Sequence, residues 1–188
     1  MKLYHGSSIP GITALKPLSF LHGKMDNSVV YLSGNLPYAL FYIWDSAHNK
    51  TTQKYVTCRL RDDLVIYEEQ FPDQLKTFYQ GVSGYIYEVE SNVFVEKTPN
   101  REHMYVCRQP IPVSDCRFIP DVYDEILRRE RAGQIRVIRY PEMPKEQLKL
   151  LHDHIVDSIR MAKMRSDPNS EQAQFYATYF PALWEQAT

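Results

Sequence analysis

Over the first two thirds of the chain, hydrophobic and polar residues alternate in short runs, and this pattern predicts β-strands. Residues 1–8 are predicted to form a short strand that ends in a Gly-Ser turn. Glycine and proline interrupt residues 9–28, which are therefore predicted to be a loop with local turns. Further strands are predicted over residues 29–32, 54–60, 64–68, 84–90, 101–108 and 116–119. We expect residues 54–119 to form an antiparallel or mixed sheet.

A helix is predicted directly after the strand of residues 29–32. Asn35 can cap its N-terminus, and Pro37 is tolerated in a first turn. Residues 36–47 are apolar almost all round, so this helix, with Tyr42 on it, is expected to be buried against the sheet. A second, shorter helix is predicted over residues 72–79.

The pattern becomes mainly helical beyond Pro120. Residues 122–131 predict a helix that stops at Gly133, and residues 134–140 predict a strand. Two amphipathic helices follow over residues 145–164 and 171–186, the second interrupted by Pro181. Their apolar faces must pack on the rest of the protein, because they would otherwise be exposed. We therefore expect an α+β protein with one domain over residues 1–120 and a helical C-terminal extension over residues 121–188 that packs on it or covers its ligand groove.

Composition narrows the class of protein and of partner. The chain of 188 residues is 44% hydrophobic and 24% charged, as in soluble globular proteins. Its 22 basic and 23 acidic residues nearly balance, so the protein has no excess of positive charge that would attract a nucleic acid. A nucleic-acid partner stays open. The sequence contains no apolar run long enough for a signal peptide or a membrane span. We therefore expect a cytoplasmic protein without a membrane partner.

The cysteines give no sign of a metal site. Cys58, Cys107 and Cys116 are odd in number and form no Cys-x-x-Cys pair. This usage suits a reducing compartment and lacks a zinc signature, so the sequence predicts no metal cofactor.

A small set of residues could carry chemistry. His5 and Gly6 end the first strand, Tyr31 lies on the strand before the predicted helix, and Tyr42 lies on that helix. Glu102 opens the late segment Glu-His-Met-Tyr-Val. In order and in element type, residues 3–119 resemble the ADP-ribosyltransferases of the diphtheria-toxin and poly(ADP-ribose) polymerase type, which carry a His-Gly, two tyrosines and a late glutamate.

The resemblance implies a role for each of these residues. It implies a split antiparallel or mixed sheet with flanking helices, and NAD as a substrate, with no metal. His5 would donate a hydrogen bond to a ribose hydroxyl of NAD, and Gly6 would let the backbone approach and pair with the nicotinamide amide. Tyr31 and Tyr42 would sandwich the nicotinamide ring. Ser7, which follows Gly6, would also bind NAD. Glu102, with His5 and Tyr31 as the other catalytic residues, would stabilise positive charge as the glycosidic bond breaks.

Three positions depart from the family pattern. Ala39 stands where many members have a serine that bonds the nicotinamide amide, Leu32 replaces an aromatic residue, and His103 stands where an aromatic residue is common. Glu96 is the next-best candidate for the catalytic carboxylate. Two other functions stay open: a non-catalytic module that binds NAD or ADP-ribose, and a protein-interaction domain that acts through the aromatic C-terminal helix. The acceptor of ADP-ribose, macromolecule or small molecule, is not indicated.

Overall fold

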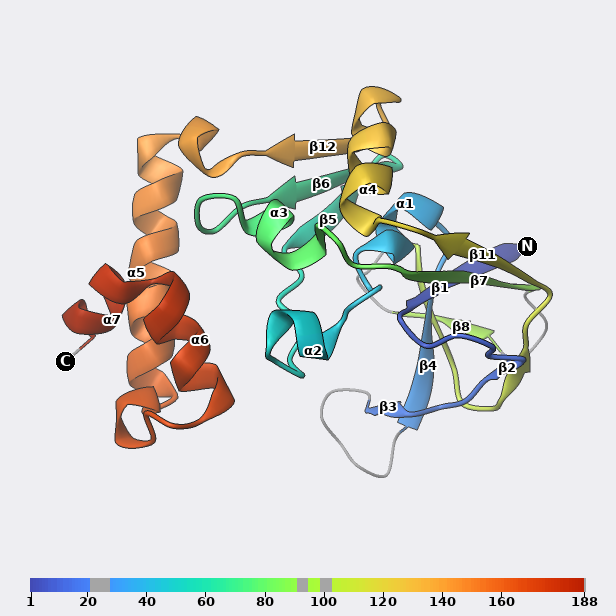
Figure 1. Cartoon of the computed structure of the whole chain (residues 1–188), viewed down its shortest axis with the longest axis horizontal. Helices are drawn as coiled ribbons and strands as arrows, with labels where there is room; N and C mark the ends of the chain where they lie inside the picture. The colour runs from blue at the N-terminus through green and yellow to red at the C-terminus, as the bar shows by residue number, and fades with distance from the viewer. Residues whose placement is uncertain (21–27, 91–94, 99–102, 188) are drawn as a thin grey trace.

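The computed structural model describes residues 1–20, 28–90, 95–98 and 103–187. It is an α+β protein in which strands and helices mix along the whole chain. Its larger sheet pairs neighbouring strands antiparallel (Figure 1). In spatial order its strands are β11 (Asp115–Ile119), β7 (Gly84–Glu90), β1 (Lys2–Ser7), β4 (Ser28–Ser33), β9 (Met104–Cys107) and β8 (Val95–Lys97), and β3 (Ser19–Phe20) also pairs with β4.

The larger sheet is split between β1 and β4. Strand β1 pairs with β7 along its whole length, from Lys2 to Ser7, but with β4 only through Tyr4 and Ser33. The other end of β4 pairs with β3, from Ser28 to Val29. Strand β4 therefore pairs with β1 at one end and with β3 at the other, and residues of all three strands line the candidate site.

A second sheet joins strands that lie far apart in the sequence. It has the order β12 (Ile135–Ile138), β6 (Leu64–Glu68) and β5 (Cys58–Arg61), with β12 parallel to β6. The expectation of one sheet over residues 54–119 was therefore wrong. Hydrophobic alternation identifies a strand, but it does not identify the partner. A small antiparallel ribbon of β2 (Ala14–Leu15) and β10 (Ile111–Pro112) packs on one face of the larger sheet.

Helix α1 (Leu36–Leu40) lies between the larger sheet and helix α4 (Val122–Arg131). The predicted helix of residues 36–47 is wrong in length, because the helix ends at Leu40 and a separate α2 covers Ser46–Asn49. The N–H groups of Tyr42 and Ile43 donate to carbonyls three residues earlier, which tightens the chain into a turn. An apolar run that is buried on all sides does not show where the helix inside it ends.

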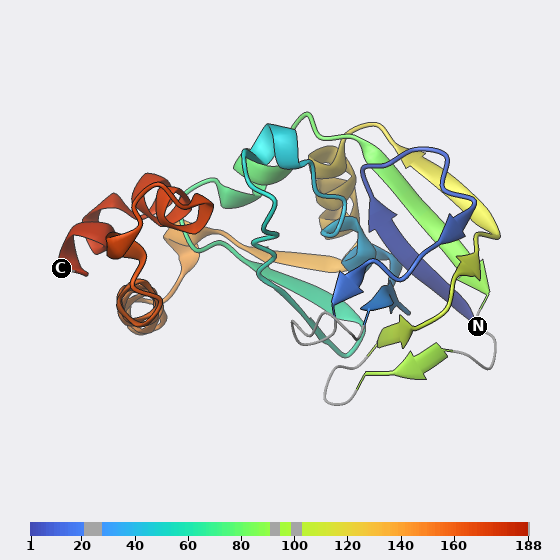
Figure 2. The same ribbon diagram turned by 90° about the horizontal axis from the view of Figure 1, so that it is seen from below.

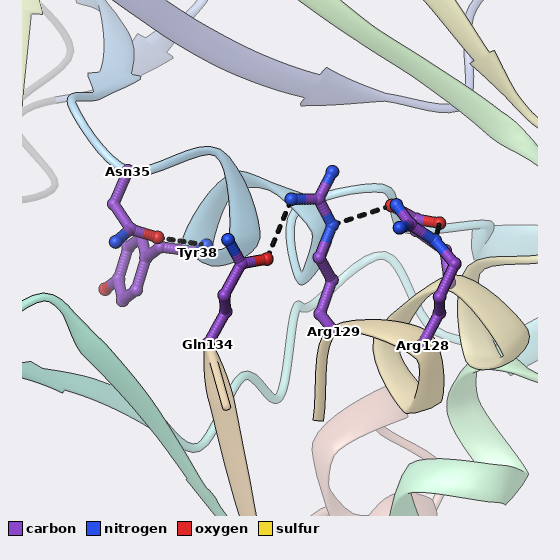
Figure 3. A network of polar contacts seen from close by, with 6 residues as sticks. Asn35, Tyr38, Arg128, Arg129 and Gln134 are labelled. Atoms are coloured by element: carbon purple, nitrogen blue, oxygen red, sulfur yellow. Dashed lines mark hydrogen bonds and ion pairs between the residues drawn. The ribbon is translucent and has the colours of Figure 1, made fainter. Parts of the chain in front are cut away.

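The predicted start of α1 is confirmed. Asn35 Oδ1 accepts a hydrogen bond of 2.9 Å from the N–H of Tyr38 (Figure 3). The same view shows a polar network at the end of α4, in which Arg129 donates to Gln134. Arg128 and Arg129 both pair with Glu125, as expected for a salt-bridged helix surface.

The hydrophobic residues form two clusters, one on each face of the larger sheet. On one face, Leu3, Tyr87 and Val89 pack under the β2–β10 ribbon. The other cluster surrounds α1 and extends through α3 (Gln74–Tyr79), α4 and the second sheet to the C-terminal helices. Strand β7 contributes to both clusters, because its successive side chains point to opposite faces.

The C-terminal helices form a separate group at the end of the molecule opposite the N-terminus (Figures 1 and 2). The helices are α5 (Lys145–Met161), α6 (Glu171–Tyr179) and α7 (Pro181–Gln186), with short 3-10 turns at Tyr140–Glu142 and Met164–Ser166. As predicted, Pro181 interrupts the last helical segment, and it begins α7. Phe175 stacks on Tyr55, and Tyr179 stacks on Phe71.

The predicted boundary at residue 120 stays a prediction. The hydrophobic core continues across it, because β12 pairs with β6, and α4 packs on α1 and α3. No helix within the described part of the chain is long and apolar enough to cross a membrane.

Candidate functional site

A cavity of about 250 Å³ opens where β1 and β4 separate. Four predicted residues, His5, Gly6, Tyr31 and Tyr42, line it together. They come from β1, β4 and the turn after α1, so the fold brings together groups that the sequence separates. The remaining lining residues are Tyr4, Ser19, Leu32, Ser33, Tyr38, Ala39, Lys54 and Met104.

His5 spans the opening between the two strands. Its Nδ1 lies 2.9 Å from the backbone carbonyl oxygen of Tyr31. A carbonyl can only accept, so Nδ1 carries the proton and the neutral ring has Nε2 as an acceptor. The resemblance implied that His5 donates to a ribose hydroxyl. The neutral ring favours the opposite direction, in which a ligand hydroxyl donates to Nε2. The contact with ribose itself stays a prediction.

The pKa of His5 lies below its ordinary value of 6.5. Burial is the main cause, since it disfavours the charged ring, and the positive charge of Lys54 acts in the same direction. The hydrogen bond to Tyr31 opposes both effects. The neutral tautomer therefore persists to lower pH than it would in a free histidine.

This shift predicts the pH dependence of ligand binding. If Nε2 accepts a hydrogen bond from a ribose hydroxyl, NAD affinity should fall on acidification as the ring gains a proton, with the midpoint of the fall below pH 6.5. Calorimetric titration with NAD across the acidic range measures the effect. The variant His5→Asn, which cannot titrate, should not show this fall in affinity. A fall with its midpoint above pH 6.5 in the unmodified protein would contradict the assignment.

Gly6 is required by the packing of α1. A Cβ atom at this position would overlap the carbonyl oxygen of Ala39 and would lie 3.1 Å from the backbone nitrogen of Ile43. We expected a side chain here to block a ligand, but in the structure it would first displace the helix. The glycine thus lets the end of α1 rest directly on β1, and this contact places Tyr42 at the cavity.

The two predicted tyrosines line the cavity from different elements. Tyr31 is half-buried on β4, and Tyr42 is half-buried in the turn after α1. Tyr42 is paired with Tyr38, a residue that the sequence did not single out. Their ring centroids are 5.5 Å apart and their hydroxyl oxygens 3.2 Å apart. The spacing of four residues on a helix could have indicated this pair.

Lys54 is the charged residue among the lining residues that the sequence pattern did not single out. It was placed at the start of a strand, but β5 begins only at Cys58. Its Nζ lies 3.4 Å from the carbonyl oxygen of Tyr42, and burial lowers the pKa of the ammonium group. None of the described lining residues is an aspartate or a glutamate.

The remaining predicted residues are not part of the described lining. Ser7 ends β1, and its hydroxyl accepts a hydrogen bond from the N–H of Ile9. Glu102 lies outside the described residues, and its role stays a prediction. Met104, two residues further along the chain, lines the cavity. Between them, the backbone carbonyl oxygen of His103 accepts a hydrogen bond of 2.8 Å from the N–H of Gly34.

Two further glutamates, Glu96 and Glu88, do not line the cavity. Glu96 on β8 is exposed and lies 3.5 Å from Arg108, and Glu88 pairs with Lys2. Within the ranges that the structure describes, no three histidine, cysteine, aspartate or glutamate residues are grouped so that they could hold a metal ion.

Comparisons of the chain with protein-family models, with curated proteins and with solved structures gave no match.

Proposed function

We propose that this protein transfers ADP-ribose from NAD to an acceptor and releases nicotinamide. One observation carries the proposal: His5, Gly6, Tyr31 and Tyr42, which the sequence pattern singled out, line a single cavity. Nothing about their spacing in the chain requires this, because they come from two strands and a turn.

The cavity suits one end of NAD. Ligand sites for drug-sized molecules typically enclose about 300–1,000 Å³. At about 250 Å³ this cavity matches a small planar group, with the remainder of the dinucleotide outside it. Four tyrosines, Tyr4, Tyr31, Tyr38 and Tyr42, are among the lining residues, and aromatic faces bind a flat ring by stacking. Nε2 of His5 would accept a hydrogen bond from the hydroxyl of the attached ribose.

The chemical step breaks the bond between the nicotinamide nitrogen and C1′ of its ribose. The bonding electrons leave with nicotinamide, which becomes neutral, and C1′ becomes an oxocarbenium-like centre. An acceptor nucleophile then bonds to C1′ and loses its proton. Glu102 is proposed to stabilise the positive charge that develops on the sugar, since a preorganised carboxylate acts most strongly on charge present only in the transition state.

The direct test is to incubate the purified chain with NAD and to measure free nicotinamide. Nicotinamide release faster than in a control without the protein supports the proposal. Water is the acceptor of ADP-ribose when no other acceptor is present. Failure to bind NAD at millimolar concentration would contradict it. Protein side chains, nucleic acids and small molecules can then be compared as acceptors, since the acceptor surface is separate from the NAD half-site.

Tyr31→Ala is expected to weaken NAD binding about 10- to 100-fold, because the variant loses both buried aromatic area and stacking. Tyr31→Phe keeps the ring and should retain most of the affinity. Trp184→Ala removes an aromatic residue on α7, which contributes nothing to the described cavity lining, and should bind NAD normally. Calorimetry of the three variants separates these outcomes, and equal loss in all of them would argue against a specific role for Tyr31.

Ala39 favours a second candidate, a module that binds NAD or ADP-ribose without turnover. It lines the cavity at the position where many members of the family offer a serine hydroxyl to the nicotinamide amide, and it cannot donate. Such a module would bind NAD and release no nicotinamide. The interaction-domain alternative has less support, because Phe175 and Phe180 are buried within the chain.

A further inference from the structure

Lys54 places a positive charge at the cavity. Among the described residues its ammonium has no carboxylate partner, and its polar contact is the carbonyl oxygen of Tyr42. The Lys54 side chain is exposed at the mouth of the cavity, and the protein atoms around its ammonium group lower the pKa of that group. A partly desolvated cation beside a cavity attracts an anion, because the anion restores the interactions that water has lost.

The C-terminal helices hold the backbone on both sides of Lys54. The carboxylate of Glu171 on α6 accepts hydrogen bonds from the N–H groups of Thr52 and Gln53 and from the Thr52 hydroxyl. On the other side, the ring of Tyr55 stacks on Phe175 with centroids 3.4 Å apart and planes 3° apart. The positions before and after Lys54 are thus both fixed by one helix from the other end of the chain.

We propose that Lys54 binds the pyrophosphate of NAD and that helix α6, through Glu171 and Phe175, positions it for this contact. The inference rests on the proposed function. With nicotinamide between the tyrosines, the group that follows its ribose in NAD is the pyrophosphate, which carries the negative charge. The C-terminal helices would then act on the NAD site without contributing to its described lining.

Binding of NAD and of nicotinamide alone separates the two parts of the ligand. Lys54→Met keeps the aliphatic chain and removes the charge, so it should weaken NAD about 10-fold or more and leave nicotinamide unchanged. Lys54→Arg keeps the charge and should recover most of the NAD affinity. Higher ionic strength should weaken NAD binding more in the unmodified protein than in Lys54→Met.

Glu171→Ala tests the role of α6. It should weaken NAD binding several-fold, again without a change for nicotinamide. Glu185→Ala removes another exposed carboxylate from the same group of helices and should leave both affinities unchanged.

The outcomes distinguish this inference from the proposed function. If the unmodified protein binds NAD and Lys54→Met binds it equally well, the role of Lys54 is wrong while the proposed function stands. If Lys54→Met weakens nicotinamide as much as NAD, the lysine supports the fold of the cavity and does not contact phosphate. If Glu171→Ala behaves like Glu185→Ala, the part assigned to α6 is wrong. If the unmodified protein binds neither ligand, the proposed function fails and this inference with it.

Discussion

Glu102→Gln is expected to lower the rate of nicotinamide release by about 10²- to 10³-fold, the loss typical when one preorganised group that stabilises transition-state charge is removed. Glutamine keeps the size and hydrogen-bonding capacity of the side chain but removes its charge. NAD affinity should change little, because the charge that Glu102 stabilises develops only as the glycosidic bond breaks. Single-turnover release of nicotinamide at saturating NAD measures the chemical step directly.

Glu96→Gln is the matched control, since Glu96 was the alternative candidate for the catalytic carboxylate. It is exposed on β8 beside Arg108 and does not line the cavity. We expect its turnover to equal that of the unmodified protein. If instead Glu96→Gln lost turnover and Glu102→Gln kept it, the catalytic assignment would move to Glu96. Full activity in both variants would remove both glutamates from the mechanism.

Gly6→Ala is expected to lower the stability of the protein by about 3 kcal/mol, at the upper end of the usual range for overpacking. The new methyl group would overlap the carbonyl oxygen of Ala39, which is a backbone atom and cannot rotate away. The end of α1 must therefore move off β1. For a chain of this length we expect the melting temperature to fall by roughly 6–12 °C, and NAD binding should weaken because the same turn carries Tyr42.

Gly34→Ala is the control for the glycine substitution. A Cβ atom at Gly34 would lie 3.4 Å from a ring atom of Tyr105, a side chain that can adjust. Its melting temperature should stay within a few degrees of the unmodified protein. A stable Gly6→Ala variant that still binds NAD would show that the contact between α1 and β1 can relax without cost to the cavity.

Several elements were predictable because their signals are local. Strands β6 and β7 and helix α4 have the predicted bounds. Short runs rich in β-branched and aromatic residues define the strands, and α4 has clear signals at both ends. Asp121 caps its N-terminus by accepting a hydrogen bond from the N–H of Asp124, and Gly133 follows with a φ of 72°. The length of α1 was not predictable in this way, because neighbours bury every side of the apolar run.

In the candidate site, too, some features follow from local sequence signals and others depend on contacts between distant segments. The residue types His-Gly and tyrosine, in their order along the chain, were sufficient to name four groups that line one cavity. Which nitrogen of His5 carries the proton depends on the carbonyl of Tyr31, which the split sheet brings within 2.9 Å. Lys54 escaped notice because the residues that hold its neighbours lie on α6, more than a hundred positions later.

The order of strands and helices, the helix ends that carry caps, and four of the residues that line the cavity follow from the amino-acid sequence, since each is marked by side chains within a few positions. The tertiary structure decided which strands pair, where β1 and β4 part, and that Lys54 joins the cavity. These features depend on contacts between segments far apart in the chain. Such contacts are selected by the packing of whole surfaces, which no local pattern records.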